Sequence, residues 1–176
     1  MATVQIFLSA VTAEFRSYRD ALHHDLDRPN VTVKVQEDFI TTGTDTLNML
    51  DEYIRGCDVV IHLVGDMTGP LAPALSVAAV RRRYPDLGER LPVLAPFLEP
   101  DAPALSYTQW EAWLALYHGK VLIIAVPQEG APRDAFYRLD AAQRDAQPCL
   151  GSEGAPTASD SGGYVDSRAA GQRRPL

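Results

Sequence analysis

Residues 58–64, with the sequence DVVIHLV, form a short and almost entirely apolar run. A strand that faces solvent on one side alternates apolar and polar residues, whereas a central strand of a parallel sheet has helices on both faces and is apolar throughout. The run therefore predicts a central strand of a parallel sheet. Residues 121–126, VLIIAV, have the same character and predict another strand of this kind.

Strands and helices alternate along about the first 130 residues. Residues 4–8 and 31–35 are rich in β-forming residues and predict two further strands, while residues 13–27 and 46–55 predict helices. The apolar residues that recur at helical spacing are Phe15, Tyr18, Leu22 and Leu26 in the first helix and Leu47, Leu50 and Ile54 in the second. This alternation predicts an α/β fold, a flavodoxin-like doubly wound parallel sheet of four to five strands.

The carboxyl ends of the predicted strands indicate where a ligand would bind. In a doubly wound sheet the ligand crevice lies outside these ends. Residues 9–12, 37–44 and 65–69 follow the first three strands and reach that edge by chain order. A small-molecule site is expected to draw on these three segments.

The segment 106–127, SYTQWEAWLALYHGKVLIIAVP, places one carboxylate in an otherwise apolar helix. An S-x-x-Q capping box and a glycine stop predict that helix over residues 107–118. Its expected core stripe comprises Trp110, Trp113, Leu114 and Tyr117. Glu111 then lies on the flank, at the seam between core and solvent where clefts open. It is either a group with a chemical role or part of a solvated helix flank.

Composition narrows the classes of partner. The chain has 176 residues and a formal net charge of −7, which is typical of a soluble domain and argues against binding to nucleic acid or to an acidic membrane. Small molecules and other proteins are the expected partners. Two cysteines without a C-x-x-C pair predict neither a disulfide framework nor a zinc site. With no signal peptide or membrane span at the N-terminus, a cytoplasmic location is expected.

Two regions interrupt the strand and helix pattern. Residues 70–105 form a Pro-rich insertion around a predicted helix, 75–84, and such a long connection is either a lid or contact surface or a packed structural excursion. Its three consecutive arginines, 81–83, are expected to form a solvated face. The domain is expected to span residues 1–147. Residues 148–176 are expected to be a disordered or altered tail, because they are poor in apolar residues and begin where a fifth strand would follow.

Several common catalytic patterns are absent from the sequence. The chain contains no G-x-x-x-x-G-K-[ST], no G-x-G-x-x-G and no G-x-S-x-G, which argues against a P-loop nucleotidase, a Rossmann dehydrogenase and the usual α/β hydrolase. No residue spacing indicates a metal site. His62 is expected to be a core or edge residue of its strand, and His118 a structural group at the end of its helix.

Four motifs occur in a set order between residues 4 and 126. They are IFLSA, then EDF before a loop, then CDVVIHLVG, and finally SYTQWEAWLALYHGKVLIIAVP. Together they resemble a Toll/interleukin-1 receptor (TIR) domain of the bacterial TIR-like group. Many TIR domains hydrolyse NAD at the bond between nicotinamide and ribose. The resemblance implies that Glu111, four residues after Tyr107, is the catalytic glutamate of such an NAD glycohydrolase.

The resemblance also implies a set of substrate-binding residues and partners. The residues are Ser9, Gly65 and Asp66 at the strand ends, Tyr107 and Trp110 on the helix, and Asp38 and Phe39 in the loop after the second strand. Ser9, Gly65 and Asp66 would approach ribose or phosphate, and Tyr107 and Trp110 would stack on nicotinamide or adenine. NAD is then the substrate, with no cofactor and no metal. TIR domains also self-associate and commonly act with a sensor protein.

Two other functions remain open at this point. A TIR-like adaptor would bind another TIR surface through residues 38–44 and the Pro-rich insertion, with Glu111 merely solvated. A nucleoside-transferring enzyme would also place a carboxylate at a ribose, but it needs a paired general acid that the sequence does not indicate.

Overall fold

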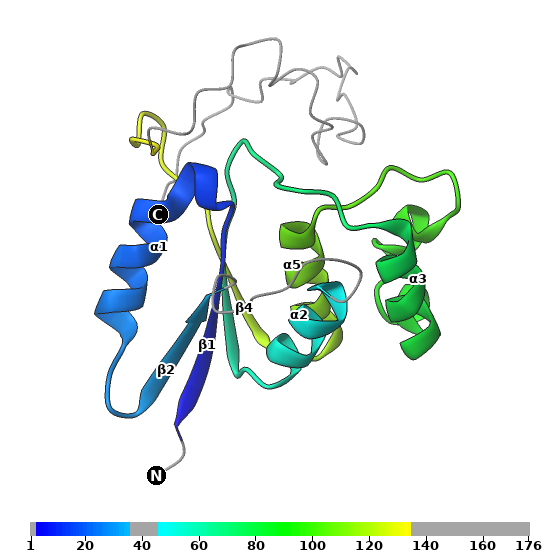
Figure 1. Cartoon of the computed structure of the whole chain (residues 1–176), viewed down its shortest axis with the longest axis horizontal. Coiled ribbons are helices and arrows are strands. Elements are labelled where there is room, and N and C mark those ends of the chain that lie inside the picture. Colours follow the sequence, from blue (N-terminus) through cyan, green and yellow to red (C-terminus); the bar gives the residue numbers. More distant parts are fainter. Residues whose placement is uncertain (1–2, 36–45, 135–176) are drawn as a thin grey trace, which may run out of the picture.

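The computed structural model describes residues 3–35 and 46–134 (Figure 1). The expectations for Asp38, Phe39 and the C-terminal tail lie outside the described residues. The elements are β1 (Val4–Ser9), α1 (Thr12–Leu26), β2 (Val31–Val35), α2 (Thr46–Arg55), β3 (Val59–Leu63), α3 (Ala74–Arg83), α4 (Leu87–Arg90), η2 (Ala95–Leu98), α5 (Tyr107–Tyr117) and β4 (Val121–Ala125). Among the described helices, none has the length and apolar character needed to cross a membrane.

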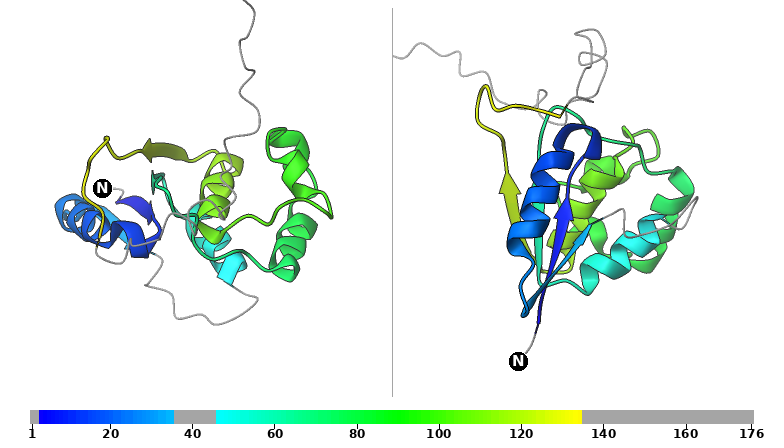
Figure 2. Two further views of the ribbon diagram at one scale, coloured as in Figure 1. Left: turned by 90° about the horizontal axis from the view of Figure 1, so that it is seen from above. Right: turned by 60° about the vertical axis from the view of Figure 1, so that its left-hand side comes forward.

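The described strands form one parallel sheet in the order β2-β1-β3-β4. Helix α1 covers one face, and α2, α3 and α5 lie on the other (Figures 1 and 2). This order and the helices on both faces confirm the predicted flavodoxin-like doubly wound fold. From β1 the chain crosses to β2 on one side, and from β2 it crosses back to β3 on the other side of β1. The direction in which strands are added therefore reverses, and the topological switch point lies between β1 and β3.

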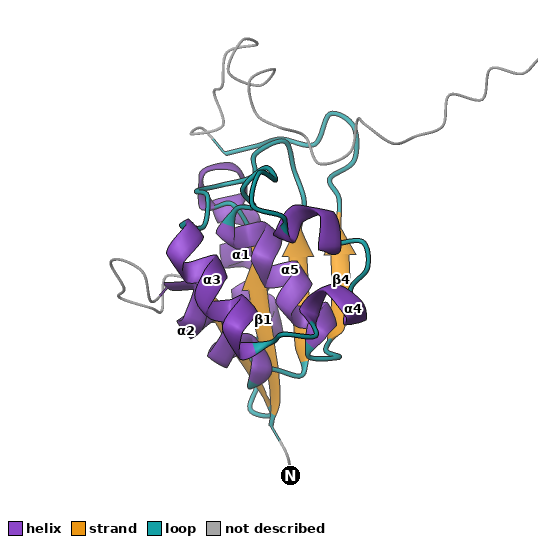
Figure 3. Ribbon diagram, turned by 90° about the vertical axis from the view of Figure 1, so that its right-hand side faces the viewer, coloured by secondary structure: helices purple, strands orange, loops and turns teal. Residues whose placement is uncertain are grey.

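Alternation along β1 divides the apolar residues between two cores. Ile6 and Leu8 pack with Val33 of β2 on the α1 side, whereas Phe7 packs with the helices of the other face. That second core is the larger one, and its buried residues include Leu50, Ile54, Val60, Trp110 and Leu114. Figure 3 shows the helices of this face in front of the strands.

Two expectations for the helices need adjustment. Tyr18 was expected in the core stripe of α1, but its ring is exposed and its hydroxyl donates to the Pro132 carbonyl. In α5, Trp110, Leu114 and Tyr117 are buried as expected, whereas Trp113 is only partly buried.

Strand β4 does not have the environment that its sequence predicts. Val121 is 58% exposed and Ile124 is 58% exposed, and no strand among residues 3–35 and 46–134 pairs with the outer edge of β4. The prediction of a strand covered on both faces is therefore wrong for residues 121–126, although it holds for β3. The apolar residues of β4 form an exposed sheet edge.

The insertion is a packed excursion beside α2 and α5. Val80, Leu87 and Leu94 are buried and belong to the larger core. Its three arginines are exposed, as expected, and Arg83 also donates to the buried carboxylate of Asp51 on α2.

Asp51 joins three helices through one carboxylate. It accepts hydrogen bonds from Arg83 at 2.7 Å and from the Tyr84 hydroxyl at 2.8 Å, and its other oxygen lies 2.7 Å from Nε2 of His118. Burial alone would raise the pKa of Asp51, but the hydrogen bonds from His118, Tyr84 and Arg83 outweigh it and lower the pKa below its ordinary value. His118 is thus placed as a structural group that fastens the end of α5 to α2.

Replacing this carboxylate should destabilise the fold. We expect Asp51→Ala to lower the free energy of unfolding by about 3 kcal/mol, because the buried partners lose their acceptor. The neighbouring exposed Glu52→Ala should change it by less than about 0.5 kcal/mol. Urea unfolding of both variants at pH 7 measures the difference, and equal effects would contradict a structural role for Asp51.

Candidate functional site

Two polar side chains lie next to each other at the switch point of the sheet. Ser9 is the last residue of β1, and the parallel register pairs it with His62 of β3. Both are buried, on the sheet face that α5 covers. The Ser9 Oγ lies 2.6 Å from Nδ1 of His62.

Glu111 completes this group from α5. The capping box formed by Ser106 and Gln109 fixes the start of the helix, so that Glu111 lies in its second turn. The Ser9 hydroxyl donates to Oε2 of Glu111 at 2.5 Å. The expectation that Glu111 lies at a seam with solvent is wrong: the residue is 1% exposed, because this flank of α5 faces the ends of β1 and β3.

The hydrogen atoms of this group can be assigned by counting. The Ser9 hydroxyl carries one hydrogen, and it donates that hydrogen to Glu111. The short contact with His62 therefore requires Nδ1 of the ring to be the donor. Burial lowers the pKa of His62 to about 4, so the ring is neutral at pH 7 and carries its hydrogen on Nδ1. A neutral chain of donors thus runs from His62 through Ser9 to the carboxylate.

A cavity of about 480 Å³ opens beside this group. Its lining comes from the start of α1, the loop after β3 and the first turn of α5: Ala10, Val11, Thr12, Ala13, Met67, Gly69, Pro70, Tyr107 and Thr108. Ala10 directly follows Ser9, and Tyr107 precedes Glu111 by one helical turn. The cavity therefore lies at the carboxyl end of β1 and β3, where a doubly wound sheet binds its ligand.

The predicted site residues fall into four groups, of which the fourth is Gly65 and Asp66. Tyr107 lines the cavity, whereas Ser9 and Glu111 are bonded to each other beside it and are not among its lining residues. Trp110 does not line it, because the side chain is buried in the larger core. Asp38 and Phe39 lie outside the described residues.

Gly65 and Asp66 lie against the carboxylate of Glu14 and do not line the cavity. The backbone N–H of Asp66 donates to the buried carboxylate of Glu14 at 3.1 Å, and a side chain at Gly65 would overlap that carboxylate. The expected contacts of these two residues with ribose or phosphate stay a prediction, and their observed partner is Glu14.

Two polar residues of this region were not singled out from the sequence. The sequence predicts only that His62 is a core or edge residue of its strand and that Glu14 belongs to a helix. The available signal for His62 was its position: it follows Val60 by two residues on the strand and so faces the same side of the sheet. No comparable pattern indicated Glu14, because its partners are backbone N–H groups of a distant loop.

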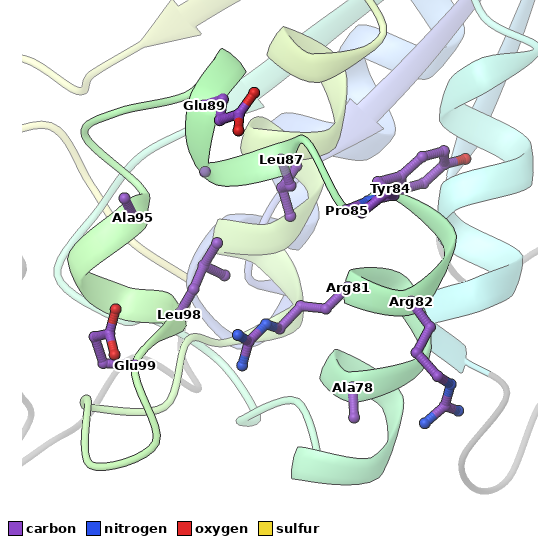
Figure 4. Close-up of a pocket in the computed structure, with 11 residues that line it drawn as sticks. Ala78, Arg81, Arg82, Tyr84, Pro85, Leu87, Glu89, Ala95, Leu98 and Glu99 are labelled. Atoms are coloured by element: carbon purple, nitrogen blue, oxygen red, sulfur yellow. The ribbon is translucent and has the colours of Figure 1, made fainter.

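A second cavity, of about 540 Å³, lies within the insertion (Figure 4). It is lined by residues of α3, α4 and η2 and by short connections between them, and Figure 4 shows the side chain of Arg81 between α3 and Leu98. Ser9, His62 and Glu111 do not line it. Among residues 3–35 and 46–134, no cluster of histidine, cysteine and carboxylate side chains could hold a metal ion.

Comparison with known proteins does not assign this chain to a family. No protein-family model, no curated protein and no solved structure matches it.

The lowered pKa of His62 predicts a pH dependence of stability. Because the unfolded chain binds a proton near pH 6.5 and the folded chain only near pH 4, the contribution of the neutral ring is complete above pH 6.5 and is lost as the pH falls to about 4. The free energy of unfolding should fall by about 3 kcal/mol over this window through His62 alone. Urea unfolding between pH 4 and pH 7.5 should give a flatter curve for His62→Gln. Parallel curves would contradict this assignment.

Proposed function

We propose that this chain is a TIR-like enzyme that hydrolyses NAD at the bond between nicotinamide and ribose, with Glu111 as the catalytic carboxylate. The observation that carries the proposal is the placement of Glu111, which Ser9 holds at the β1–β3 switch point beside a cavity large enough for a small ligand. In this proposal, NAD is the substrate and no cofactor or metal takes part.

The chemistry requires little more than a well-placed negative charge. Nicotinamide leaves as a neutral molecule from a cationic precursor, and positive charge develops on the ribose as the bond breaks. A carboxylate against the ribose stabilises that charge, most effectively where water is excluded. Water then adds to the ribosyl cation and gives ADP-ribose and a proton.

The surroundings of Glu111 suit this role. The Ser9 hydroxyl that bonds Oε2 is uncharged, and the His62 ring behind it is neutral at pH 7. The Ser9 hydroxyl orients the carboxylate, and the His62 ring in turn contacts Ser9. A ribose hydroxyl can donate to a carboxylate in the same way as Ser9 does, so substrate binding can replace this hydrogen bond by an equivalent one.

Because Glu111 is buried, substrate binding must move part of the protein to bring the ribose to the carboxylate. At 1% exposure Glu111 is closed off from solvent. Tyr107 lines the cavity one turn away on the same helix, and Ala10 lines it next to Ser9. We place the ribose against this boundary, where a small shift of the first turn of α5 or of the end of β1 brings it to the carboxylate.

Removal of the charge at Glu111 tests the proposal. We expect Glu111→Gln to lower the rate of nicotinamide release at saturating NAD by at least about 100-fold, because the amide keeps the size and an acceptor for Ser9 but not the charge. Purified protein at high concentration, to permit self-association, is incubated with NAD and the release is followed by chromatography.

The exposed Glu99→Gln serves as the matched control and should turn over NAD as the parent does. Thermal unfolding of each variant verifies its fold. Equal turnover by Glu111→Gln and the parent would exclude a catalytic role for Glu111, and loss of the fold in Glu111→Gln would assign the residue a structural role instead.

A second candidate function has one observation in its favour. Exposed apolar side chains occur on the edge strand β4 and on the insertion, with Ile124 58%, Leu75 72% and Val93 71% exposed. Such side chains are typical of protein-binding surfaces when they gather in a patch. A TIR-like adaptor would use them to bind another TIR-like domain, including a second copy of this chain. Self-association without any NAD turnover would favour the adaptor.

A further inference from the structure

The carboxylate of Glu14 is buried and holds the loop that follows β3. Its two oxygens accept the backbone N–H groups of Asp66 at 3.1 Å and Met67 at 2.9 Å, and the residue is fully buried. Two successive N–H groups that point at one carboxylate form an anion-binding turn. Here the anion is a side chain of the protein itself, from the first turn of α1.

Gly65 shows how closely this carboxylate approaches the loop. A Cβ atom built at Gly65 would overlap both oxygens of Glu14. A side chain at Gly65 would therefore displace the carboxylate of Glu14, and glycine leaves the space that this carboxylate fills. The loop and the carboxylate fit each other only with glycine at this position.

Arg133 connects the segment after β4 to the carboxylate of Glu14. Its Nε donates to Glu14 at 2.8 Å, and its guanidinium lies over the ring of Phe15, 5.3 Å from the centroid. The side chain of Arg133 is 16% exposed, so the ion pair is largely shielded from water. The segment is fastened to α1 at two more points, by Tyr18 to the Pro132 carbonyl and by the Asp134 carboxylate to the backbone N–H of Ser17.

The loop that Glu14 holds is one wall of the candidate cavity. Met67, Gly69 and Pro70 line that cavity, and Met67 is itself bonded to Glu14. We propose that Glu14 is a positioning residue for this cavity, and that Arg133 makes the shape of the cavity depend on the segment after β4. This inference rests on the proposed function, since it assigns the cavity to NAD.

The contact also limits how a dinucleotide can bind. The N–H groups of Asp66 and Met67 already donate to a protein carboxylate, so they do not supply the phosphate contacts that a loop at this edge often provides. Glu14 touches neither Ser9 nor Glu111 in any hydrogen bond given by the structure, and it acts on the wall alone. Its removal should therefore weaken NAD binding and leave the chemical step nearly unchanged.

Glu14→Gln and Arg133→Met test the inference with two readouts. In the first, hydrogen exchange of the Asp66 and Met67 amides should speed up at least tenfold in Glu14→Gln, because an amide side chain cannot accept both N–H groups and the guanidinium. In the same spectra the methyl signal of Met67 should shift in both variants. Only three methionines occur, so its loss in Met67→Leu identifies that signal.

In the second readout, nicotinamide release should show KM for NAD raised about tenfold in Glu14→Gln and severalfold in Arg133→Met, with kcat within about threefold of the parent. The exposed Arg82→Met is the control for loss of an arginine and should match the parent in both readouts. Glu111→Gln should lose kcat while the exchange of Asp66 and Met67 stays as in the parent.

The outcomes separate this inference from the proposed function. Unchanged exchange in Glu14→Gln, or faster exchange with an unchanged KM, would overturn the positioning role, and a fall in kcat alone would do the same. If the parent itself releases no nicotinamide, the proposed function fails. The exchange and methyl signals then still decide whether Glu14 and Arg133 shape the cavity. Arg133→Met also keeps the test open if Glu14→Gln does not fold.

Discussion

The parallel pairing of β1 with β3 is the constraint on which the candidate site depends. Its register sets Ser9 beside His62, and the same pairing creates the switch point at which the cavity opens. Neither side chain would meet the other in a register shifted by one residue, because a shift of one moves a side chain to the opposite face. The apolar residues that precede them, Phe7 and Val60, fix this register by their place in the core.

Within residues 3–35 and 46–134, three carboxylates are buried, and their observed partners differ. Asp51 is bonded by Arg83, Tyr84 and His118, and Glu14 by two backbone N–H groups and Arg133. Glu111 accepts from the uncharged hydroxyl of Ser9. Burying a carboxylate costs free energy, and a cationic partner offsets much of that cost while also neutralising the charge. Glu111 rather than Asp51 or Glu14 is the proposed catalytic group because it lies at the β1–β3 switch point beside the cavity, whereas Asp51 joins α2 to α3 and α5 and Glu14 holds the loop after β3.

Much of the fold could be predicted from the sequence, and the site only in part. Local sequence patterns indicated each strand that the structure describes and the helices α1, α2, α3 and α5. The burial of Glu111 could not be predicted: it depends on how α5 crosses the strand ends, and the spacing of residues along one helix does not contain that information. The Glu14 contact joins residues 52 positions apart through backbone N–H groups. Almost any residue type supplies such a group, so no pattern of side chains predicts the contact. The position of His62 on its strand predicts which face of the sheet it lies on. Its contact with Ser9 could not be predicted, because that contact depends on the register between β1 and β3.

The exposed edge of β4 lies at the start of a segment that contacts Glu14, which holds the wall of the cavity. An apolar strand normally has a neighbour on each side, and β4 has one neighbour, β3, among the residues that the structure describes. The chain leaves β4 and reaches α1, where Arg133 enters the contact that holds the cavity wall. Any partner that covers β4 would thus act on a segment fastened to Glu14. If the chain is an enzyme that works in assemblies, this is a physical route by which association at the sheet edge can change the affinity of the cavity without touching Glu111.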